Sequence, residues 1–165
     1  MAVLTQARLR ELLTYDPETG LFIRNIGRSG PGARAGNVAG CDNGAGYIRI
    51  YVDGAPYKAH RLAWFYVHGE WPEEIDHKNG VRCDNRLVNL RPVTRAQNNK
   101  NNGRYRTNTT GLKGVTLYKP NGKWRAQIQS DGAKIALGYF DTPEQAFAAY
   151  ADAARRLHGE YARVA

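Results

Sequence analysis

The sequence predicts an α+β protein built from two small units. Near the middle of the chain, residues 75–90 read "IDHKNGVRCDNRLVNL", a polar span with a short extended stretch on each side. The C-terminal part instead alternates apolar and polar residues over three stretches and then shows an alanine-rich helical pattern. Between the two, residues 98–111 lose apolar periodicity, which is typical of a linker. We place the boundary near Arg106, with predicted domains at residues 1–106 and 107–165.

The overall charge favours a polyanionic partner. The 165 residues carry a formal net charge of +9, and Lys and Arg occur along the whole chain. Folded basic surfaces of this kind bind nucleic acids, because neutralised phosphates release their condensed counterions. The sequence contains no apolar run approaching the ~18 residues of a membrane span, and its start lacks a signal peptide's apolar centre. We therefore expect no membrane partner and a cytoplasmic location.

The first unit is expected to begin with a short helix at residues 5–13, followed by a strand in "LFIR". A Gly-rich basic loop at residues 27–36 precedes a strand at residues 47–52 and a two-residue hairpin turn. "HRLAWFYVHGEWP" predicts a buried helix that ends at Gly69, and its His60 and His68 are expected to be hydrogen-bonded structural residues. The chain has two cysteines, Cys41 and Cys83, without CxxC spacing, and this number excludes a four-cysteine zinc site.

The polar span lies between two predicted strands, "EEIDH" and "NLRPVT", and a helix follows whose start is indicated by Thr94 and Gln97 at capping-box spacing. Hydrolysis of a phosphodiester needs an activated water, neutralisation of the phosphate charge and help for the leaving oxygen. A divalent cation on hard oxygen ligands supplies the last two, and a neutral histidine supplies the first. Asp76 and His77 adjoin at a strand end, and Asn98 lies one turn into the helix. This order predicts a metal-dependent nuclease site.

The stretch resembles the HNH endonuclease motif, the ββα-metal finger, in Asp76-His77, in "DNRLVNLR" and in Asn98; the preceding "AHRLAWFYVHGEWP" is also similar to phage and intron-borne members. The resemblance implies an N-terminal ββα-metal HNH module in which His77 is the general base and Asn89 braces the loop and orients it. It further implies that Asp76 and Asn98 hold Mg²⁺, with Mn²⁺ as an alternative and Asn99 as a neighbouring candidate. An asparagine at the last motif position makes the site all oxygen, which favours Mg²⁺.

Two other readings of the span fail. An EF-hand loop needs acidic or amide ligands at alternating positions, where this chain has Lys78 and Gly80. A cysteine nucleophile needs a neighbouring base, and Cys83 has no convincing one. A polar loop held together only by its own turns remains an alternative.

The second unit predicts three strands, at residues 112–118, 123–130 and 134–139, and a helix capped by Asp141 or Thr142 that opens with Pro143. We expect one sheet face, with Val115 and Leu117 among its residues, to pack under the helix. The helix face toward the sheet is expected to comprise Phe147, Tyr150, Ala154 and Leu157. The other sheet face and the linker supply the candidate DNA contacts, namely Lys113, Thr116, Tyr118, Lys123, Arg125, Gln127, Gln129, Lys134, Arg104 and Arg106.

Residues 111–162, with "LGYFDT" and "HGE", resemble the Apetala-type (ethylene-response-factor) DNA-binding domain. The resemblance implies three antiparallel strands backed by one helix, with the sheet in the major groove. Plant factors carry arginines and tryptophans on that face where this chain has Thr116, Gln127, Gln129 and Ala136, so the sequence preference is not expected to carry over.

Together the two resemblances predict a phage-type or mobile homing endonuclease that cuts or nicks double-stranded DNA. We expect a monomer or weak dimer with no obligate protein partner. A non-catalytic DNA-binding regulator on an inactive HNH scaffold is the alternative, and RNA binding is a third hypothesis because charge alone does not distinguish the nucleic acids.

Overall fold

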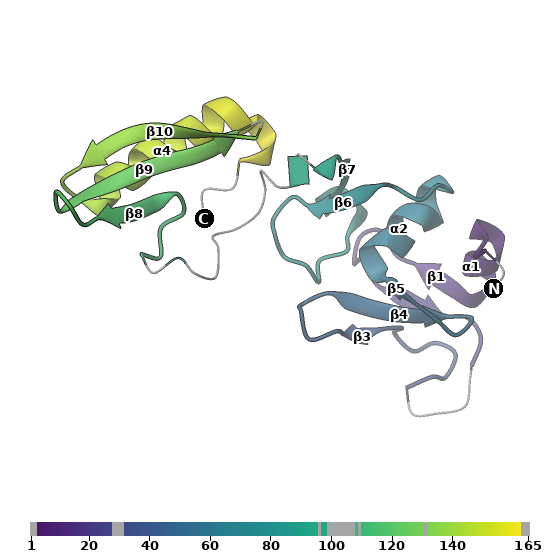
Figure 1. Ribbon diagram of the computed structural model, residues 1–165. Helices are drawn as coiled ribbons and strands as arrows, with labels where there is room; N and C mark the ends of the chain where they lie inside the picture. The colour runs from purple at the N-terminus through teal and green to yellow at the C-terminus, as the bar shows by residue number, and fades with distance from the viewer. Residues whose placement is uncertain are drawn as a thin grey trace. The chain divides into compact units, whose positions relative to one another are not determined.

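The computed structural model describes residues 3–27, 32–95, 97–98, 108, 110–130 and 132–162, and it divides the chain into two compact units, Met1–Val93 and Thr94–Ala165. Each unit is described here by itself. Both combine helices with small antiparallel sheets (Figure 1), as the α+β prediction requires. Arg106 lies outside the described residues, so the predicted boundary stays a prediction. No helix among the described residues has the length and apolar character needed to cross a membrane.

The first unit begins with helix α1, Gln6–Leu12, where the Thr5 side chain accepts a hydrogen bond from the Arg8 amide as predicted for an N-cap. Strands β1 and β2 then form an antiparallel hairpin, with Tyr15 opposite Phe22. Their bounds are Leu13–Tyr15 and Phe22–Arg24.

A three-stranded antiparallel sheet follows in the order β3-β4-β5. Its strands are Cys41–Asp42, Ile48–Val52 and Ala55–Lys58. Helix α2, Ala59–His68, packs against β4 and β5 and ends at Gly69 with φ 76°, a left-handed conformation that glycine adopts without strain. The core between these elements includes the fully buried residues Leu9, Leu13, Phe22, Ile50, Val52 and Leu62.

The polar span is held by a second hairpin. Strand β6, Glu74–His77, pairs antiparallel with β7, Leu90–Val93, and a 3-10 turn at Leu87–Asn89 leads into β7. The two strands flanking the polar span are therefore confirmed.

The second unit contains a sheet in the order β10-β9-β8 with helix α4 packed against it (Figure 1). Its elements are β8 Val115–Tyr118, β9 Lys123–Ser130, β10 Ala133–Phe140, α4 Pro143–His158 and a 3-10 turn at Gly159–Tyr161. Thr142 caps α4 in a reciprocal capping box with Gln145. Val115, Ala126, Ile128 and Tyr150 are buried between sheet and helix.

Two predicted core positions are wrong. Leu117 is 47% exposed and Leu157 is 40% exposed. Leu117 lies on β8, an edge strand, and Leu157 lies in the last turn of α4. Sequence alternation gives the direction of a side chain but not how far the covering helix extends over it.

Candidate active site

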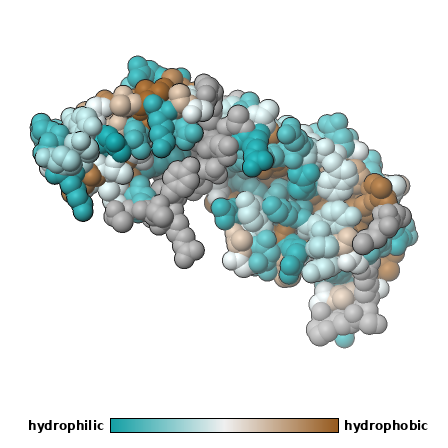
Figure 2. All heavy atoms as spheres, in the orientation of Figure 1, coloured by the Kyte–Doolittle hydropathy of each residue, from teal (hydrophilic) through white to brown (hydrophobic). Residues whose placement is uncertain are grey.

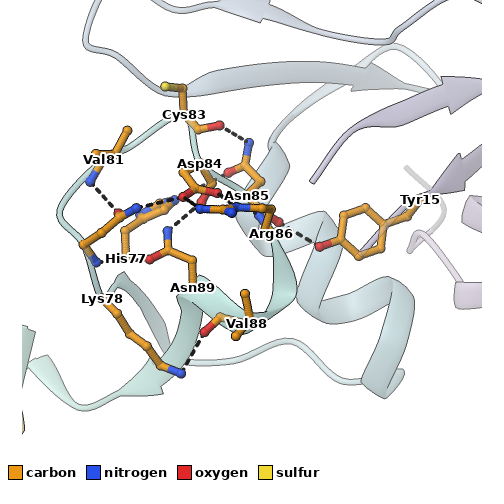
Figure 3. A network of polar contacts seen from close by, with 11 residues as sticks. Tyr15, His77, Lys78, Val81, Cys83, Asp84, Asn85, Arg86, Val88 and Asn89 are labelled. Carbon is orange, nitrogen blue, oxygen red and sulfur yellow. Dashed lines mark hydrogen bonds and ion pairs between the residues drawn. The ribbon is translucent and has the colours of Figure 1, made fainter. Parts of the chain in front are cut away.

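The loop between β6 and β7 is folded around the buried amide of Asn89 (Figure 3). Asn89 Oδ1 accepts a hydrogen bond from the Asn79 amide at 3.0 Å, and Asn89 Nδ2 donates to the carbonyl of Asp84 at 2.8 Å. The backbone amide of Lys78 donates to the Asn89 carbonyl at 2.9 Å. One side chain thus joins the start of the loop to its middle, through one bond accepted by its oxygen and one donated by its nitrogen.

Asp76 is buried and paired with Arg91, which lies directly opposite it in the β6–β7 register. Arg91 Nη2 and Nε donate to Asp76 Oδ2 at 2.8 and 3.1 Å. A carboxylate taken out of water needs such a partner, since an unpaired buried charge is strongly destabilising.

His77 is 5% exposed, and aromatic side chains surround it. Its ring lies edge-on to that of His60, with centroids 4.9 Å apart, and 6.1 Å from the ring of Tyr47. Its Nε2 is 3.4 Å from Asn85 Oδ1. Burial lowers the pKa of His77 below its ordinary value, with a smaller opposing effect from Asn85, so the imidazole is neutral at pH 7.

His60 is buried as predicted, but the expected hydrogen bonding is only partly right. Its Nδ1 has no hydrogen-bond partner among the described residues, and its ring packs against His77 and Tyr47 instead. Burial lowers the pKa of His60 to about 3, so it is also neutral. His68 is exposed and stacks on Trp64 with ring centroids 4.0 Å apart.

The β1–β2 hairpin supports the loop from the N-terminal side. The Tyr15 hydroxyl donates to the Asn85 carbonyl at 2.7 Å, and the Leu87 amide donates to the Pro17 carbonyl at 3.1 Å. At Gly20, with φ +75°, an added Cβ would lie 2.5 Å from the Arg86 amide nitrogen. Only glycine permits this approach of the two backbones.

A surface ion pair rigidifies the middle of the loop. Arg86 Nε and Nη2 donate to the two carboxylate oxygens of Asp84 at 2.8 and 2.6 Å, and Asn79 Nδ2 donates to the same carboxylate at 2.7 Å. The hydrogen bond from Arg86, above all, lowers the pKa of Asp84 to about 2.

The predicted metal ligand Asn98 belongs to the second unit. Thr94 and Gln97 form the predicted reciprocal capping bonds, and the Asn98 amide donates to the Thr94 carbonyl at 2.9 Å, as in the first turn of a helix. Because Asp76 is in the other unit, the pairing of these two ligands stays a prediction, as does the complete ββα-metal arrangement. Within the described ranges no three His, Cys, Asp or Glu residues cluster as metal ligands.

The outward face of the second unit's sheet carries most of the predicted DNA contacts. The strand register places Thr116 beside Arg125, Tyr118 beside Lys123, and Lys134 beside Gln129. These side chains and that of Gln127 alternate with the buried Ala126 and Ile128 of β9.

One predicted contact lies away from this face, and two others fall outside the described residues. Lys113 precedes β8, and its Nζ lies 6.0 Å from the ring of Tyr150, a residue of α4, so it lies on the helix side of the sheet. Arg104 and Arg106 lie outside the described residues. Contact of any of these side chains with DNA stays a prediction.

Sequence reasoning missed Tyr139 on the same face. A register shift between Ala136 and Gly138 places Tyr139 opposite Arg125, and its ring lies 5.1 Å from that of Tyr118. Strict alternation along β10 would have turned Tyr139 toward the helix. The signal that could have located the bulge is Gly138, a glycine inside the strand pattern, with φ +128°. Sequence reasoning also missed Arg91 and Tyr47. The register of the two flanking strands pointed to Arg91, whereas no local signal pointed to Tyr47.

One comparison with known proteins covers the region of this site. The profile of the HNH endonuclease family matches residues 57–100. Protein 3.8 of Escherichia phage T7 is 32% identical over 112 residues, which span 65% of this chain and 92% of the phage protein. No solved structure is a significant match. The family match starts at residue 57, so the predicted N-terminal position of the HNH module is wrong; residues 1–56 precede the matched region.

Proposed function

Because the chain belongs to the HNH endonuclease family, we propose that it is a metal-dependent DNA endonuclease, of phage or mobile homing type, that hydrolyses or nicks phosphodiester bonds in double-stranded DNA. The family domain at residues 57–100 contains Asp76, His77 and Asn89, and Asn98 falls at its end. We place the activity in the cytoplasm of a bacterial or phage-infected cell.

The observation that carries the proposal is the environment of His77. A general base must be neutral at the working pH, and burial between His60 and Tyr47 keeps this imidazole neutral. In the tautomer with hydrogen on Nε2, that hydrogen faces Asn85 Oδ1 and leaves Nδ1 as the basic nitrogen. This nitrogen would accept the proton of the attacking water. The braces from Asn89 would hold the adjoining loop during that transfer.

The proposed metal ligands suit a hard cation. Asp76 would supply a carboxylate oxygen and Asn98 a carboxamide oxygen, the ligand types that Mg²⁺ prefers and Mn²⁺ accepts. When bound, the ion would neutralise the phosphate and assist the leaving oxygen. Arg91 would fix the orientation of the Asp76 carboxylate through Oδ2.

The second unit would deliver the nuclease to its target. Its three-stranded sheet backed by α4 has the element order of an Apetala-type domain. In that arrangement Arg125, Gln127 and Gln129 would face base edges in the major groove, and Lys123 and Lys134 would contact phosphates. Figure 2 shows many hydrophilic residues, interspersed with hydrophobic ones, on the face of the molecule in view.

A non-catalytic DNA-binding regulator is the second candidate, and one observation favours it. The Asp76 carboxylate is already paired with Arg91, so the pair can be a purely structural contact that needs no metal. The phage relative's name, Protein 3.8, states no activity.

Nicking of a supercoiled plasmid separates the two candidates. With purified full-length protein and Mg²⁺ we expect metal-dependent relaxation that EDTA abolishes and that His77→Ala removes, while the variant still binds duplex DNA. No Mg²⁺- or Mn²⁺-dependent strand break at high protein concentration, with binding retained, would identify the regulator. Mapping the ends of the products by sequencing would give the target site.

A further inference from the structure

A second basic surface lies in the first unit, on the outward face of the β3-β4-β5 sheet. In β4 the side chains of Ile50 and Val52 are buried, whereas Arg49, which precedes Ile50, is exposed. The register places Arg49 directly opposite Lys58 of β5, which is also exposed. Like charges at directly opposed positions destabilise an antiparallel pair, so the fold gains nothing from this arrangement without an anion.

The cations of this surface contact aromatic rings and not carboxylates. Lys58 Nζ lies 4.9 Å from the centroid of the Tyr47 ring, and Arg82 Cζ, from the β6–β7 loop, lies 5.0 Å from the same centroid. Within the part of the chain that the structure describes, neither cation forms an ion pair with Asp or Glu. A tyrosine ring positions a cation but leaves its charge available to a phosphate.

The surface is also held rigidly beside the nuclease site. Arg82 Nη1 donates to the Ala45 carbonyl at 3.0 Å, which ties the β6–β7 loop to the turn before β4. The Tyr47 amide donates to Asn43 Oδ1, and the Tyr47 ring lies 6.1 Å from that of His77. The Tyr47 ring thus lies near both cations, Lys58 and Arg82, and near the proposed general base His77.

We propose that Lys58 and Arg82, positioned over Tyr47, form a phosphate clamp that holds the DNA backbone beside the bond to be cut, with Arg49 extending the clamp along β4. This rests on the proposed nuclease function and assigns a substrate-binding site within the first unit itself. A DNA strand carries one charge per about 3.4 Å of helix axis, so cations this close to His77 meet phosphates within a few nucleotides of the scissile one. The clamp contributes placement of the strand, not sequence readout.

The salt dependence of binding tests the clamp. Full-length protein in EDTA is titrated into a fluorescent DNA duplex of about 30 base pairs, and log K is plotted against log salt for wild type, Lys58→Gln and Arg82→Gln. Each variant should reduce the slope by about 0.9, the value for one lost phosphate contact. Arg10→Gln is the matched control, since Arg10 also stacks over a tyrosine, Tyr66 at 5.2 Å, but lies on α1. It should leave the slope unchanged.

Conservative variants separate a charge effect from damage to the loop. Lys58→Arg and Arg82→Lys keep the charge and should restore the slope. The clamp would be overturned if both Gln variants had the same slope as wild type. It would also be overturned if Arg10→Gln reduced the slope as much as they do. These outcomes are distinct from failure of the proposed function, in which wild type itself neither binds the duplex nor nicks a plasmid.

Discussion

Arg91 and Asp76 form a buried ion pair across the β6–β7 hairpin, with two guanidinium nitrogens donating to one carboxylate oxygen. The pair lies one residue from His77, so it fixes the end of β6 from which the proposed general base projects.

Arg91→Ala is expected to lower the free energy of unfolding by about 3–5 kcal/mol, because it leaves the Asp76 carboxylate buried without this partner. Urea denaturation monitored by tryptophan fluorescence measures the change. Arg86→Ala, which breaks the exposed pair with Asp84, is the control and should have a much smaller effect. Comparable losses in the two variants would contradict the importance assigned to burial.

Asn89→Ala is expected to cost about 1–3 kcal/mol, because the Asn79 amide and the Asp84 carbonyl lose their hydrogen bonds to its side chain. Plasmid nicking should fall more steeply than stability, since the loop beside His77 loses its brace. Val88→Ala tests a neighbouring residue that is 73% exposed and should change neither quantity. Full nicking activity in Asn89→Ala at a temperature where it is folded would refute the bracing role.

The rate of nicking is expected to fall at acid pH, with the midpoint of the fall below pH 6.5. A buried His77 has a lowered pKa, so the basic neutral form persists as pH falls through the ordinary value of 6.5 and is protonated only below it. A profile of kcat against pH at saturating Mg²⁺ measures the midpoint. His68→Gln, at an exposed histidine, should not move it. A midpoint at or above 6.5 would contradict the assignment of His77 as a buried base.

Gly20→Ala is expected to destabilise the protein more than Gly54→Ala. Both glycines have positive φ, +75° and +82°, so both substitutions carry a backbone cost of about 1–2 kcal/mol. At Gly54 nothing lies within 4 Å of the added Cβ, whereas at Gly20 the Arg86 amide nitrogen lies 2.5 Å from it. The difference in Tm between the two variants measures the destabilisation caused by the contact of the added Cβ at position 20 with the Arg86 backbone. Equal shifts in Tm would show that the β1–β2 hairpin does not press against the loop.

Local signals were enough to predict most of the elements. Neighbouring residues predicted the Thr5 cap, a cap at Asp141 or Thr142, the Gly69 helix end and the strands on both sides of the polar span. Such features depend on hydrogen bonds within a few residues of the chain, and those residues are visible in the sequence. Exposure of Leu117 and Leu157 was not predictable in this way, because it depends on how far one element covers another.

In the candidate site, too, local features were predictable from the sequence and contacts between distant residues were not. His77 and its neighbour Asp76 were predicted as site residues because their residue types, spacing and element order resemble an HNH motif. The family match at residues 57–100 includes both positions, and their roles stay predictions. The partner of each was not found. Arg91 reaches Asp76 through strand register, and His60 and Tyr47 reach His77 from a different helix and sheet.

The sequence by itself determined the chemistry available, namely a carboxylate and an imidazole side by side in a polar loop of a strongly basic chain. Only the tertiary structure decided their state. Packing against Tyr47 and His60 makes the His77 imidazole neutral, and Arg91 orients the carboxylate. The physical reason is that desolvation and ion pairing act over a few ångströms in space. The separation of two residues along the chain does not reveal whether they lie that close in the fold.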